Sequence, residues 1–332
     1  MVLVSSWLKV IGVIVIFMML SLAILWFVTT QPLLSRTPVV ESDIVVDAQA
    51  LQDYVYHLSN ELPPRSDDIA NLDVAAAYIF DELSRFSDNV NDQTFVIDGL
   101  TYRNVIAHFG QKSDQCGSYI IGAHYDVLGG HPGADDNASG VAGLLELARL
   151  FAKADLPCPI ELVSYTLEET VGHGHKGSLY HARDLAERDI KVEFMMSLEM
   201  IGYFSNEPNS QDYPLPVLNT IYPTVGNFIA VVGDFKQIAL TRFIKASFRS
   251  SSSVPVRSIN TSKKVPGITW SDHASYWQFG FPAVMITDTS YNRNHNYHTK
   301  YDTWDTLDYA TMSKVVAGVY HATLSHMMDE AL

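Results

Sequence analysis

The densest group of potentially reactive side chains lies in residues 119–140, which read YIIGAHYDVLGGHPGADDNASG. His124 offers an imidazole nitrogen, and Asp126, two residues further on, is placed to hold the other ring N–H and set the tautomer. Asp135 and Asp136 are adjacent, so their carboxylates repel each other unless they share a proton or a cation. These residue types indicate a metal site. Taken alone, however, a His-x-Asp pair at a strand end is more often structural, and an Asp-Asp pair is more often a solvated turn.

Further metal-type ligands follow other apolar runs of the chain. They are Glu168 and Glu169 after residues 160–167, Glu199 after residues 192–198, and His295 and His298 after residues 282–287. Open α/β sheets bind ligands at the carboxyl ends of their parallel strands, so these groups belong at one edge together with His124. Several carboxylates at one edge are costly without cations to neutralise them. The sequence therefore predicts a metal centre there.

Alternating strand and helix patterns position these residues. Apolar, β-branched runs predict strands at 94–97, 103–109, 119–121, 160–167, 192–198, 228–232 and 282–287. Helical spacing predicts helices at 48–58, 74–86, 141–151, 177–188, 235–248 and 309–328. The first two strands form an antiparallel pair joined by a turn at Asp98-Gly99. The alternation of the remaining elements predicts an α/β fold, a three-layer α/β/α sandwich around a mostly parallel mixed sheet.

The composition excludes one class of partner. The 332 residues include 22 Lys and Arg against 37 Asp and Glu, a net charge of −15. No cluster of basic residues stands out in the sequence, so a nucleic-acid partner is not expected. An acidic surface chiefly favours solubility and does not identify a substrate.

Residues 10–28 are almost wholly apolar and long enough to span a bilayer as a helix. No clear small-residue cleavage site follows, so we predict a signal anchor at 1–28, a linker at 29–40 and a catalytic domain at 41–332, with a cleaved signal peptide as the alternative. Lys9 precedes the run and acidic residues follow it. This asymmetry, weakened by Arg36, favours a single-pass membrane protein whose catalytic domain is extracytoplasmic, in a periplasm or a lumen.

The only two cysteines, Cys116 and Cys158, each precede a predicted buried strand. If the two strands are neighbours in a parallel sheet, both thiols start at the same edge. We therefore hypothesise a Cys116–Cys158 disulfide. Two unrelated buried thiols are the alternative.

Six segments together resemble the co-catalytic di-zinc aminopeptidases, the leucyl-aminopeptidase-like metallopeptidase family twenty-eight. They are GAHYD (122–126), GADDNASG (133–140), YTLEE (165–169), SLEMIGY (197–203), SDHASYW (271–277) and NYHTKYDTWDTLD (296–308). They follow the order of the family and cover most of residues 45–330. The resemblance implies the zinc-exopeptidase fold and hydrolysis of peptide substrates with a free N-terminus. It does not indicate an oligomeric state.

The resemblance also implies a role for each residue, with two Zn²⁺ ions per chain. Its implied metal ligands are His124 and Glu199 on one ion, Glu169 and His298 on the other, and Asp136 as the bridge between them. Glu168 is implied as the general base that activates a hydroxide shared by the two ions, and Asp126 as the residue that orients His124. A cis peptide bond is implied between Asp136 and Asn137.

Some positions depart from the family and leave alternatives open. Glu199 stands where well-studied members carry Asp, and a related family with this change acts on C-termini, so a di-zinc hydrolase of C-terminal or N-acylated substrates is an alternative. A tyrosine that stabilises the tetrahedral intermediate in some relatives aligns with Ile268, which leaves Tyr203 and Tyr297 as candidates for that role. His173 and His175 either line the substrate pocket or form a solvated loop.

Two further classes share the scaffold. A single-zinc glutaminyl cyclase lacks the full set of five ligands that this chain carries. A catalytically inactive receptor domain loses ligands or the base, and neither is lost here.

Overall fold

The computed structural model describes residues 2–33, 44–66, 68–111, 116–169 and 176–330. Its helices are α1 (Val2–Thr30), α2 (Ala48–Tyr56), α3 (Ile69–Ser84), α4 (Gly140–Phe151), α5 (Gly177–Glu187), α6 (Ile238–Ser251), α7 (His273–Gln278) and α8 (Tyr309–Glu330). Its strands are β1 (Val90–Ile97), β2 (Leu100–Phe109), β3 (Ser118–His124), β4 (Ile160–Tyr165), β5 (Val192–Glu199), β6 (Ile229–Asp234), β7 (Val256–Thr261) and β8 (Ala283–Thr287).

All eight strands form one sheet in the order β1-β2-β4-β3-β5-β8-β6-β7. The four central strands β4, β3, β5 and β8 run parallel. On one side β1 and β2 pair antiparallel, and on the other β6 and β7 run parallel to each other and antiparallel to β8. The mixed sheet with parallel central strands confirms the predicted fold class.

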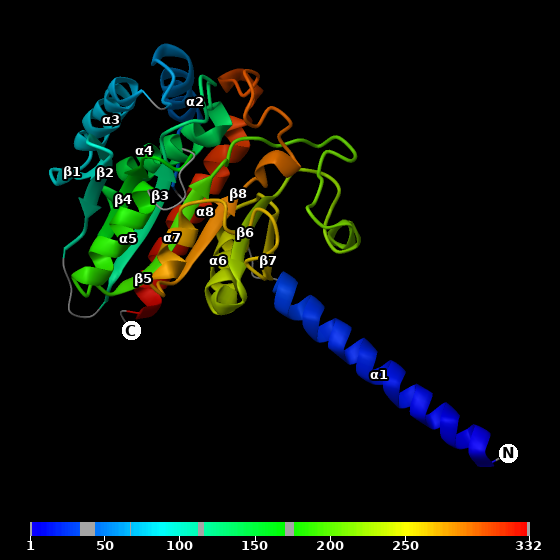
Figure 1. The fold of residues 1–332 in the computed structure, drawn as a ribbon. Coiled ribbons are helices and arrows are strands. Elements are labelled where there is room, and N and C mark those ends of the chain that lie inside the picture. Colours follow the sequence, from blue (N-terminus) through cyan, green and yellow to red (C-terminus); the bar gives the residue numbers. More distant parts are fainter. Residues whose placement is uncertain (1, 34–43, 67, 112–115, 170–175, 331–332) are drawn as a thin grey trace.

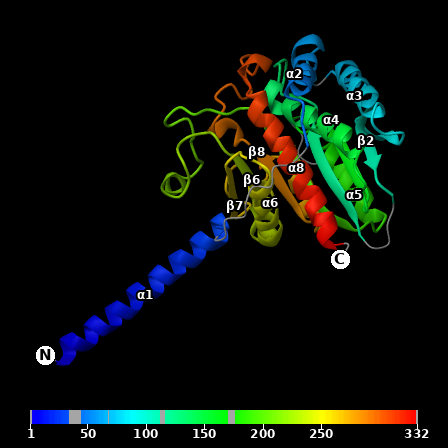
Figure 2. The same cartoon turned by 180° about the vertical axis from the view of Figure 1, so that it is seen from behind.

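Helices cover both faces of the sheet. Helices α4, α6 and α8 contribute to the larger apolar core, with α2 and α3 packed beside them, and Figure 2 views this side. Helices α5 and α7 contribute to the smaller core on the opposite face, which is in front in Figure 1. Strand β3 is buried along its whole length between β4 and β5. A strand covered on both faces needs a continuous apolar run, which is why residues 119–121 predicted it.

Two elements were not predicted from the sequence, namely β7 and α7. The run VRSINT of β7 alternates buried and half-buried residues, but four of its six residues are polar or charged. The polar side chain of Asn260 is buried because its amide donates hydrogen bonds to Asp234 O and Thr241 Oγ1. The other elements lie where they were predicted, with ends displaced by several residues at some positions.

The predicted disulfide is present. Cys116 and Cys158 are bonded, and their Cα atoms are 5.9 Å apart. They precede β3 and β4, which pair in parallel from Tyr119 and Ile160 onward. The hypothesis of a Cys116–Cys158 disulfide is confirmed by the structure.

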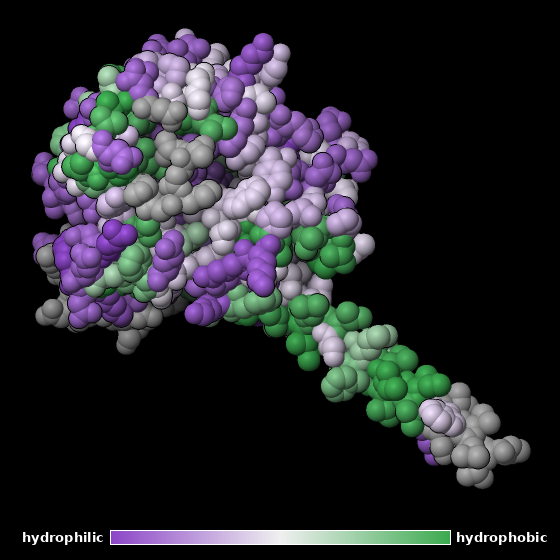
Figure 3. All heavy atoms as spheres, viewed as in Figure 1, coloured by the Kyte–Doolittle hydropathy of each residue, from purple (hydrophilic) through white to green (hydrophobic). Residues whose placement is uncertain are grey.

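Helix α1 projects away from the body of the protein, as Figures 1 and 2 show. Its segment Lys9–Thr30 has a mean hydropathy of 2.8 and no buried residue in its most apolar part. Figure 3 shows the apolar surface of this helix continuing up to the body of the protein. By length and composition, α1 is long and apolar enough to cross a membrane.

Candidate metal centre

The carboxyl ends of the central parallel strands meet at one edge of the sheet. His124 ends β3 opposite Tyr165 of β4, and Glu199 ends β5 opposite Thr287 of β8. Gly122 allows the ring of Tyr165 to pack directly on β3, because a Cβ atom at this position would overlap the ring. The residues after each strand therefore face a common space.

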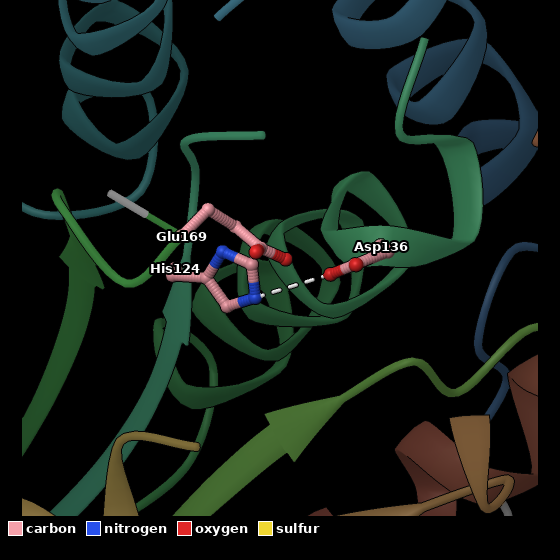
Figure 4. A group of neighbouring side chains, drawn as sticks. All are labelled: His124, Asp136 and Glu169. Carbon is pink, nitrogen blue, oxygen red and sulfur yellow. Dashed lines mark ion pairs between the residues drawn. The ribbon is translucent and has the colours of Figure 1, made fainter. Parts of the chain in front are cut away.

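Two groups of side chains meet at Asp136. His124 Nε2 lies 3.3 Å from Asp136 Oδ1 and 3.4 Å from Glu199 Oε2. His298 Nε2 lies 3.1 Å from Asp136 Oδ2 and 2.9 Å from Glu169 Oε1. Each oxygen of Asp136 thus faces a different histidine, and Figure 4 shows His124, Asp136 and Glu169 pointing toward one another. The structure brings together all five residues that were predicted as ligands.

The donor atoms of this group fit a metal ion. One ligand atom from each of His124, Asp136 and Glu169 lies within 4.8 Å of the others. Within the part of the chain that the structure describes, the buried atoms His124 Nε2 and Asp136 Oδ1 have no hydrogen-bond partner. Buried polar atoms are normally satisfied, so this pair calls for a ligand. Imidazole nitrogens and carboxylates are donors that Zn²⁺ accepts.

Without a metal, protons compensate the charges of this group. Burial and the negative charge of Asp136 raise the pKa of Glu169 to about 9, and burial raises the pKa of Glu199. Although burial opposes its charge, hydrogen bonds to Asp136 and Glu169 raise the pKa of His298 to about 10. Metal ligands must be deprotonated, so a cation at this centre would displace these protons.

A network of buried polar groups holds the loop that carries Asp136. Asp302 Oδ1 accepts the N–H of Asp135 at 2.9 Å, and its Oδ2 accepts the N–H of Asp136 at 3.1 Å. Arg65 donates from Nε to Tyr125 O at 2.7 Å and from Nη2 to Gly133 O at 2.8 Å. Asp302 and Arg65 were not predicted as parts of the site, because only the folded chain shows that they contact this loop.

The same loop is fastened to β5. The Asn137 amide donates to Leu198 O at 2.8 Å, and its oxygen accepts the N–H of Met200 at 3.0 Å. The peptide bond between Asp136 and Asn137 is cis, as the resemblance implied. Asp135 points away from the histidines, and its carboxylate accepts hydrogen bonds from Asn294 Nδ2 at 2.8 Å and from a main-chain N–H.

Asp126 contacts both glutamates of the site and His124. Its carboxylate accepts the main-chain N–H of Glu168 at 3.0 Å and of Glu169 at 2.9 Å. His124 Nδ1 lies 3.1 Å from the main-chain oxygen of Asp126 and 3.6 Å from its carboxylate. The carboxylate was predicted to orient His124; in the structure it lies near the His124 ring and also accepts two hydrogen bonds from the turn that carries both glutamates. Leu167, just before this turn, adopts a left-handed conformation with φ of 62°.

Other side chains support the carboxylates of the centre. The ammonium of Lys176 forms an ion pair with Glu168, and Ser271 Oγ donates to Glu199 Oε2 at 2.7 Å. Asp272 is buried nearby, and burial raises its pKa to about 7. The SDHASYW segment therefore contributes supporting residues rather than members of the group around Asp136.

Of the two candidate tyrosines, Tyr203 is half-buried and its main-chain N–H donates to Asp288 Oδ2 at 2.9 Å. His295 is exposed and takes no part in the group. His173 and His175 lie outside the described residues. Tyr297 stacks on His298, with ring centroids 3.6 Å apart, and lines a cavity of about 110 Å³ that adjoins Glu199.

The sequence is similar to a known family of peptidases. The family model for peptidase family M28 matches residues 104–323. The chain is 43% identical over 282 residues to the uncharacterized protein YfbL of Escherichia coli strain K12, covering 82% of this chain and 86% of YfbL. It is 30% identical over 217 residues to the probable aminopeptidase YDR415C of Saccharomyces cerevisiae, covering 60% of this chain and 51% of the yeast protein.

Solved structures that resemble the fold include an aminopeptidase and a glutaminyl cyclase. The zinc aminopeptidase BSAP from Bacillus subtilis matches with a TM-score of 0.67 and 13% identity, covering 86% of this chain and 96% of BSAP. The glutaminyl cyclase of Porphyromonas gingivalis matches with a TM-score of 0.61 and 21% identity, covering 88% of this chain and 100% of the cyclase. At such identities the likeness extends to the fold alone.

Proposed function

Because the chain belongs to peptidase family M28, we propose that it is a membrane-anchored di-zinc aminopeptidase. The family makes it an aminopeptidase-like metallopeptidase, and zinc is the metal that the family implies. The observation that carries the finer proposal is the position of Asp136, whose Oδ1 faces His124 and whose Oδ2 faces His298. A carboxylate shared in this way suits a bridge between two ions.

In this proposal each ion takes one histidine and one glutamate. His124 and Glu199 would hold the first ion, Glu169 and His298 would hold the second, and Asp136 would be the ligand shared by both. When bound, the zinc ions supply Lewis acidity, which lowers the pKa of a water molecule and polarises the scissile carbonyl.

Glu168 is the proposed general base. Its carboxylate accepts a proton from the attacking water and delivers it to the leaving amine. Two contacts support its position: Asp126 accepts its main-chain N–H, and Lys176 forms an ion pair with its side chain. Glu169 is adjacent in the chain and directs its carboxylate to His298 instead. Neighbouring glutamates can therefore divide the roles of base and ligand.

The direction of cleavage is also part of the proposal. Relatives of the chain are named aminopeptidases, which supports cleavage from a free N-terminus. A free N-terminus is thus the expected anchor of the substrate. Glu199 at the position of the family's Asp keeps C-terminal and N-acylated substrates as the alternative.

A glutaminyl cyclase is the second candidate. The fold covers the whole chain of the cyclase from Porphyromonas gingivalis. A cyclase releases ammonia from an N-terminal glutamine and does not shorten the peptide. This difference makes the two functions separable by the mass of the product.

The proposed anchor, linker and catalytic domain (1–28, 29–40 and 41–332) draw support from the end of α1. Thr30 and Gln31 are buried, and Lys245 Nζ donates to Thr30 O at 2.7 Å and to Gln31 O at 3.1 Å. Ser258 Oγ also donates to Thr30 O, at 2.8 Å. Cleavage that removed these residues would leave both donors without their partners, which favours an uncleaved anchor. From the charge asymmetry around residues 10–28, we propose that the catalytic domain lies on the extracytoplasmic side.

The test uses the full-length protein in detergent micelles, loaded with zinc. It is incubated with an unblocked peptide, its N-acetylated twin and a peptide that begins with glutamine, and the products are identified by mass spectrometry. Stepwise shortening of the unblocked peptide from its N-terminus alone is the expected result. Shortening from the C-terminus, or removal of the acetyl group, would support the alternative substrates. Loss of ammonia without shortening would support the cyclase.

A variant of the proposed base tests whether any observed cleavage depends on this site. Glu168→Gln keeps the size of the side chain and removes its basicity, so it should bind zinc but not cleave the peptide. No product from the zinc-loaded wild type would contradict the proposed function.

A further inference from the structure

The cavity beside Glu199 extends across three further strands. Glu199 of β5 pairs with Thr287 of β8, Thr287 pairs with Ala230 of β6, and Ala230 pairs with Arg257 of β7. All four residues line the cavity. Neighbouring strands lie about 4.8 Å apart, so the backbone of Arg257 is about 14 Å from that of Glu199. The cavity thus leads from the candidate metal centre to an arginine.

The walls of the cavity between these ends are mostly aromatic and apolar. Its lining includes Phe228, Trp270, Tyr291 and Tyr297. A side chain that enters it therefore leaves water over most of its length. An anionic group at its tip would then need a positive partner at the far end.

Arg257 retains unused hydrogen-bonding capacity. Its one hydrogen bond in the described structure is from Nη1 to the main-chain oxygen of Val256, at 3.2 Å. A guanidinium carries five N–H donors. The neighbouring hydroxyls are already engaged, since Tyr213 donates to Pro223 O and Tyr222 donates to Ser258 O.

Within the described residues, Arg257 forms no ion pair with a carboxylate. Asp212 also lines the cavity, but it is exposed and is not ion-paired to Arg257. Burial lowers the pKa of Arg257, and the positive charge of Arg249 lowers it further. A half-buried guanidinium without a counter-charge can pair with a carboxylate through two parallel hydrogen bonds.

The surroundings of Arg257 are also positively charged. Arg242, Lys245 and Arg249 on α6 lie behind β7, and they donate to main-chain oxygens of residues 30–33 rather than to carboxylates. In a protein with a net charge of −15, this end of the cavity is therefore locally positive. Local positive potential attracts an anionic group.

We propose that Arg257 binds a carboxylate of the substrate and makes the enzyme selective for an acidic first residue. The inference rests on the proposed function, because the cavity adjoins the scissile bond only if the centre at Asp136 acts on peptides. A glutamate or aspartate side chain is the expected source of the carboxylate, since the cavity starts at Glu199 and ends at Arg257. The α-carboxylate of a very short peptide has the same chemistry and is distinguished by the test.

The test compares peptides that differ only in charge. The full-length, zinc-loaded protein in detergent receives peptides that begin with glutamate or with glutamine, each with a free or an amidated C-terminus. We expect kcat/KM to be about tenfold or more higher for the glutamate peptide. Arg257→Gln should lower the glutamate-to-glutamine ratio about 10- to 100-fold. Arg249→Gln removes a charge from the same region but does not line the cavity, so this control should keep the wild-type ratio.

If amidation of the C-terminus, and not the first residue, controls the effect of Arg257→Gln, Arg257 binds the α-carboxylate. The proposal is overturned if Arg257→Gln changes the kcat/KM ratio of glutamate to glutamine peptides, and that of free to amidated peptides, no more than Arg249→Gln does.

A binding measurement keeps the inference separate from the proposed function. If the wild type cleaves none of the peptides, calorimetric titration with L-glutamate and L-glutamine replaces the kinetic ratio. Tighter binding of glutamate in the wild type, lost in Arg257→Gln, would support the carboxylate site even though the proposed activity had failed. Equal affinity for the two amino acids in the wild type would reject the site.

Discussion

Replacing Asp126 by asparagine separates two explanations of what this residue does. In the structure, the carboxylate accepts the N–H groups of Glu168 and Glu169 at 3.0 and 2.9 Å. The nearest acceptor for His124 Nδ1 is instead the main-chain oxygen of Asp126, which the substitution leaves in place. The variant should therefore disturb the turn with the glutamates more than it disturbs His124.

The expected loss of zinc affinity in Asp126→Asn follows from the two hydrogen bonds that the carboxylate accepts. An asparagine can accept one of the N–H groups, but its own amide group then faces the other one. A buried hydrogen bond to a charged acceptor is worth about 1.5–3 kcal/mol. Asp126 is 1% exposed, so water does not replace the lost bond. Expressed through Glu169, this loss corresponds to about 10- to 100-fold weaker binding of the ion that Glu169 and His298 are proposed to hold.

The assay measures zinc affinity in two backgrounds, each with one proposed ion already weakened. Glu199→Gln leaves chiefly the ion of Glu169 and His298, and Glu169→Gln leaves chiefly the ion of His124 and Glu199. Competition with a chromophoric chelator reports the affinity of the remaining ion. Asp126→Asn should weaken it about 10- to 100-fold in the Glu199→Gln background and much less in the Glu169→Gln background.

The reverse pattern would refute this reasoning. If Asp126→Asn weakened zinc binding mainly in the Glu169→Gln background, its carboxylate would act through His124, as was expected from the sequence. Equal effects in both backgrounds would show that the substitution disturbs the whole edge of the sheet.

The remaining predictions concern single, separable features. Glu168→Gln should lower kcat about 100- to 10,000-fold with unchanged zinc content by metal analysis, and retained turnover contradicts its role as base. Asp136→Asn should lose zinc as well as activity, and two tightly bound ions would rule out the bridge. Replacing Cys116 and Cys158 by serine removes a link across 42 residues, so the free energy of unfolding from denaturant titration should fall by about 4 kcal/mol, whereas an unchanged midpoint argues against it. Burial lowers the pKa of Lys245 from 10.5 to about 8, so between these pH values the unfolded chain binds more protons than the folded one. As the pH rises from 8 to 10.5, the free energy of unfolding of the wild type should therefore increase relative to that of Lys245→Gln, and parallel pH curves would contradict this.

The arrangement of the site could be predicted because it follows from topology. Buried parallel strands need continuous apolar runs, and such runs are visible in the sequence. The side chains that follow them then meet at one edge whatever the order of the strands. His124 and Glu199 come together in this way although 74 residues separate them along the chain.

The residues that hold the site in place could not be predicted in the same way. Arg65 follows two prolines in the sequence and resembles an exposed break in the chain. In the structure it is 1% exposed, and it donates hydrogen bonds to main-chain oxygens of Tyr125, Pro132 and Gly133. Partners so distant in the sequence leave no periodic pattern. The same holds for Arg257, because only the order of the strands in the sheet shows that it and Glu199 line one cavity. Their strands β7 and β5 lie on either side of β6 and β8.

The buried groups around Asp136 link metal binding to the stability of the loop that carries it. Asp302 holds the main-chain N–H groups of Asp135 and Asp136, and burial together with the charge of Asp135 raises the pKa of Asp302 to about 8. Each carboxylate that the fold buries here disfavours the ionisation of the next one. A cation at His124 and Asp136 reverses this relation, because it stabilises the ionised form of every carboxylate nearby. The centre should therefore be ordered most firmly when metal is bound, and the same residues should serve both folding and catalysis.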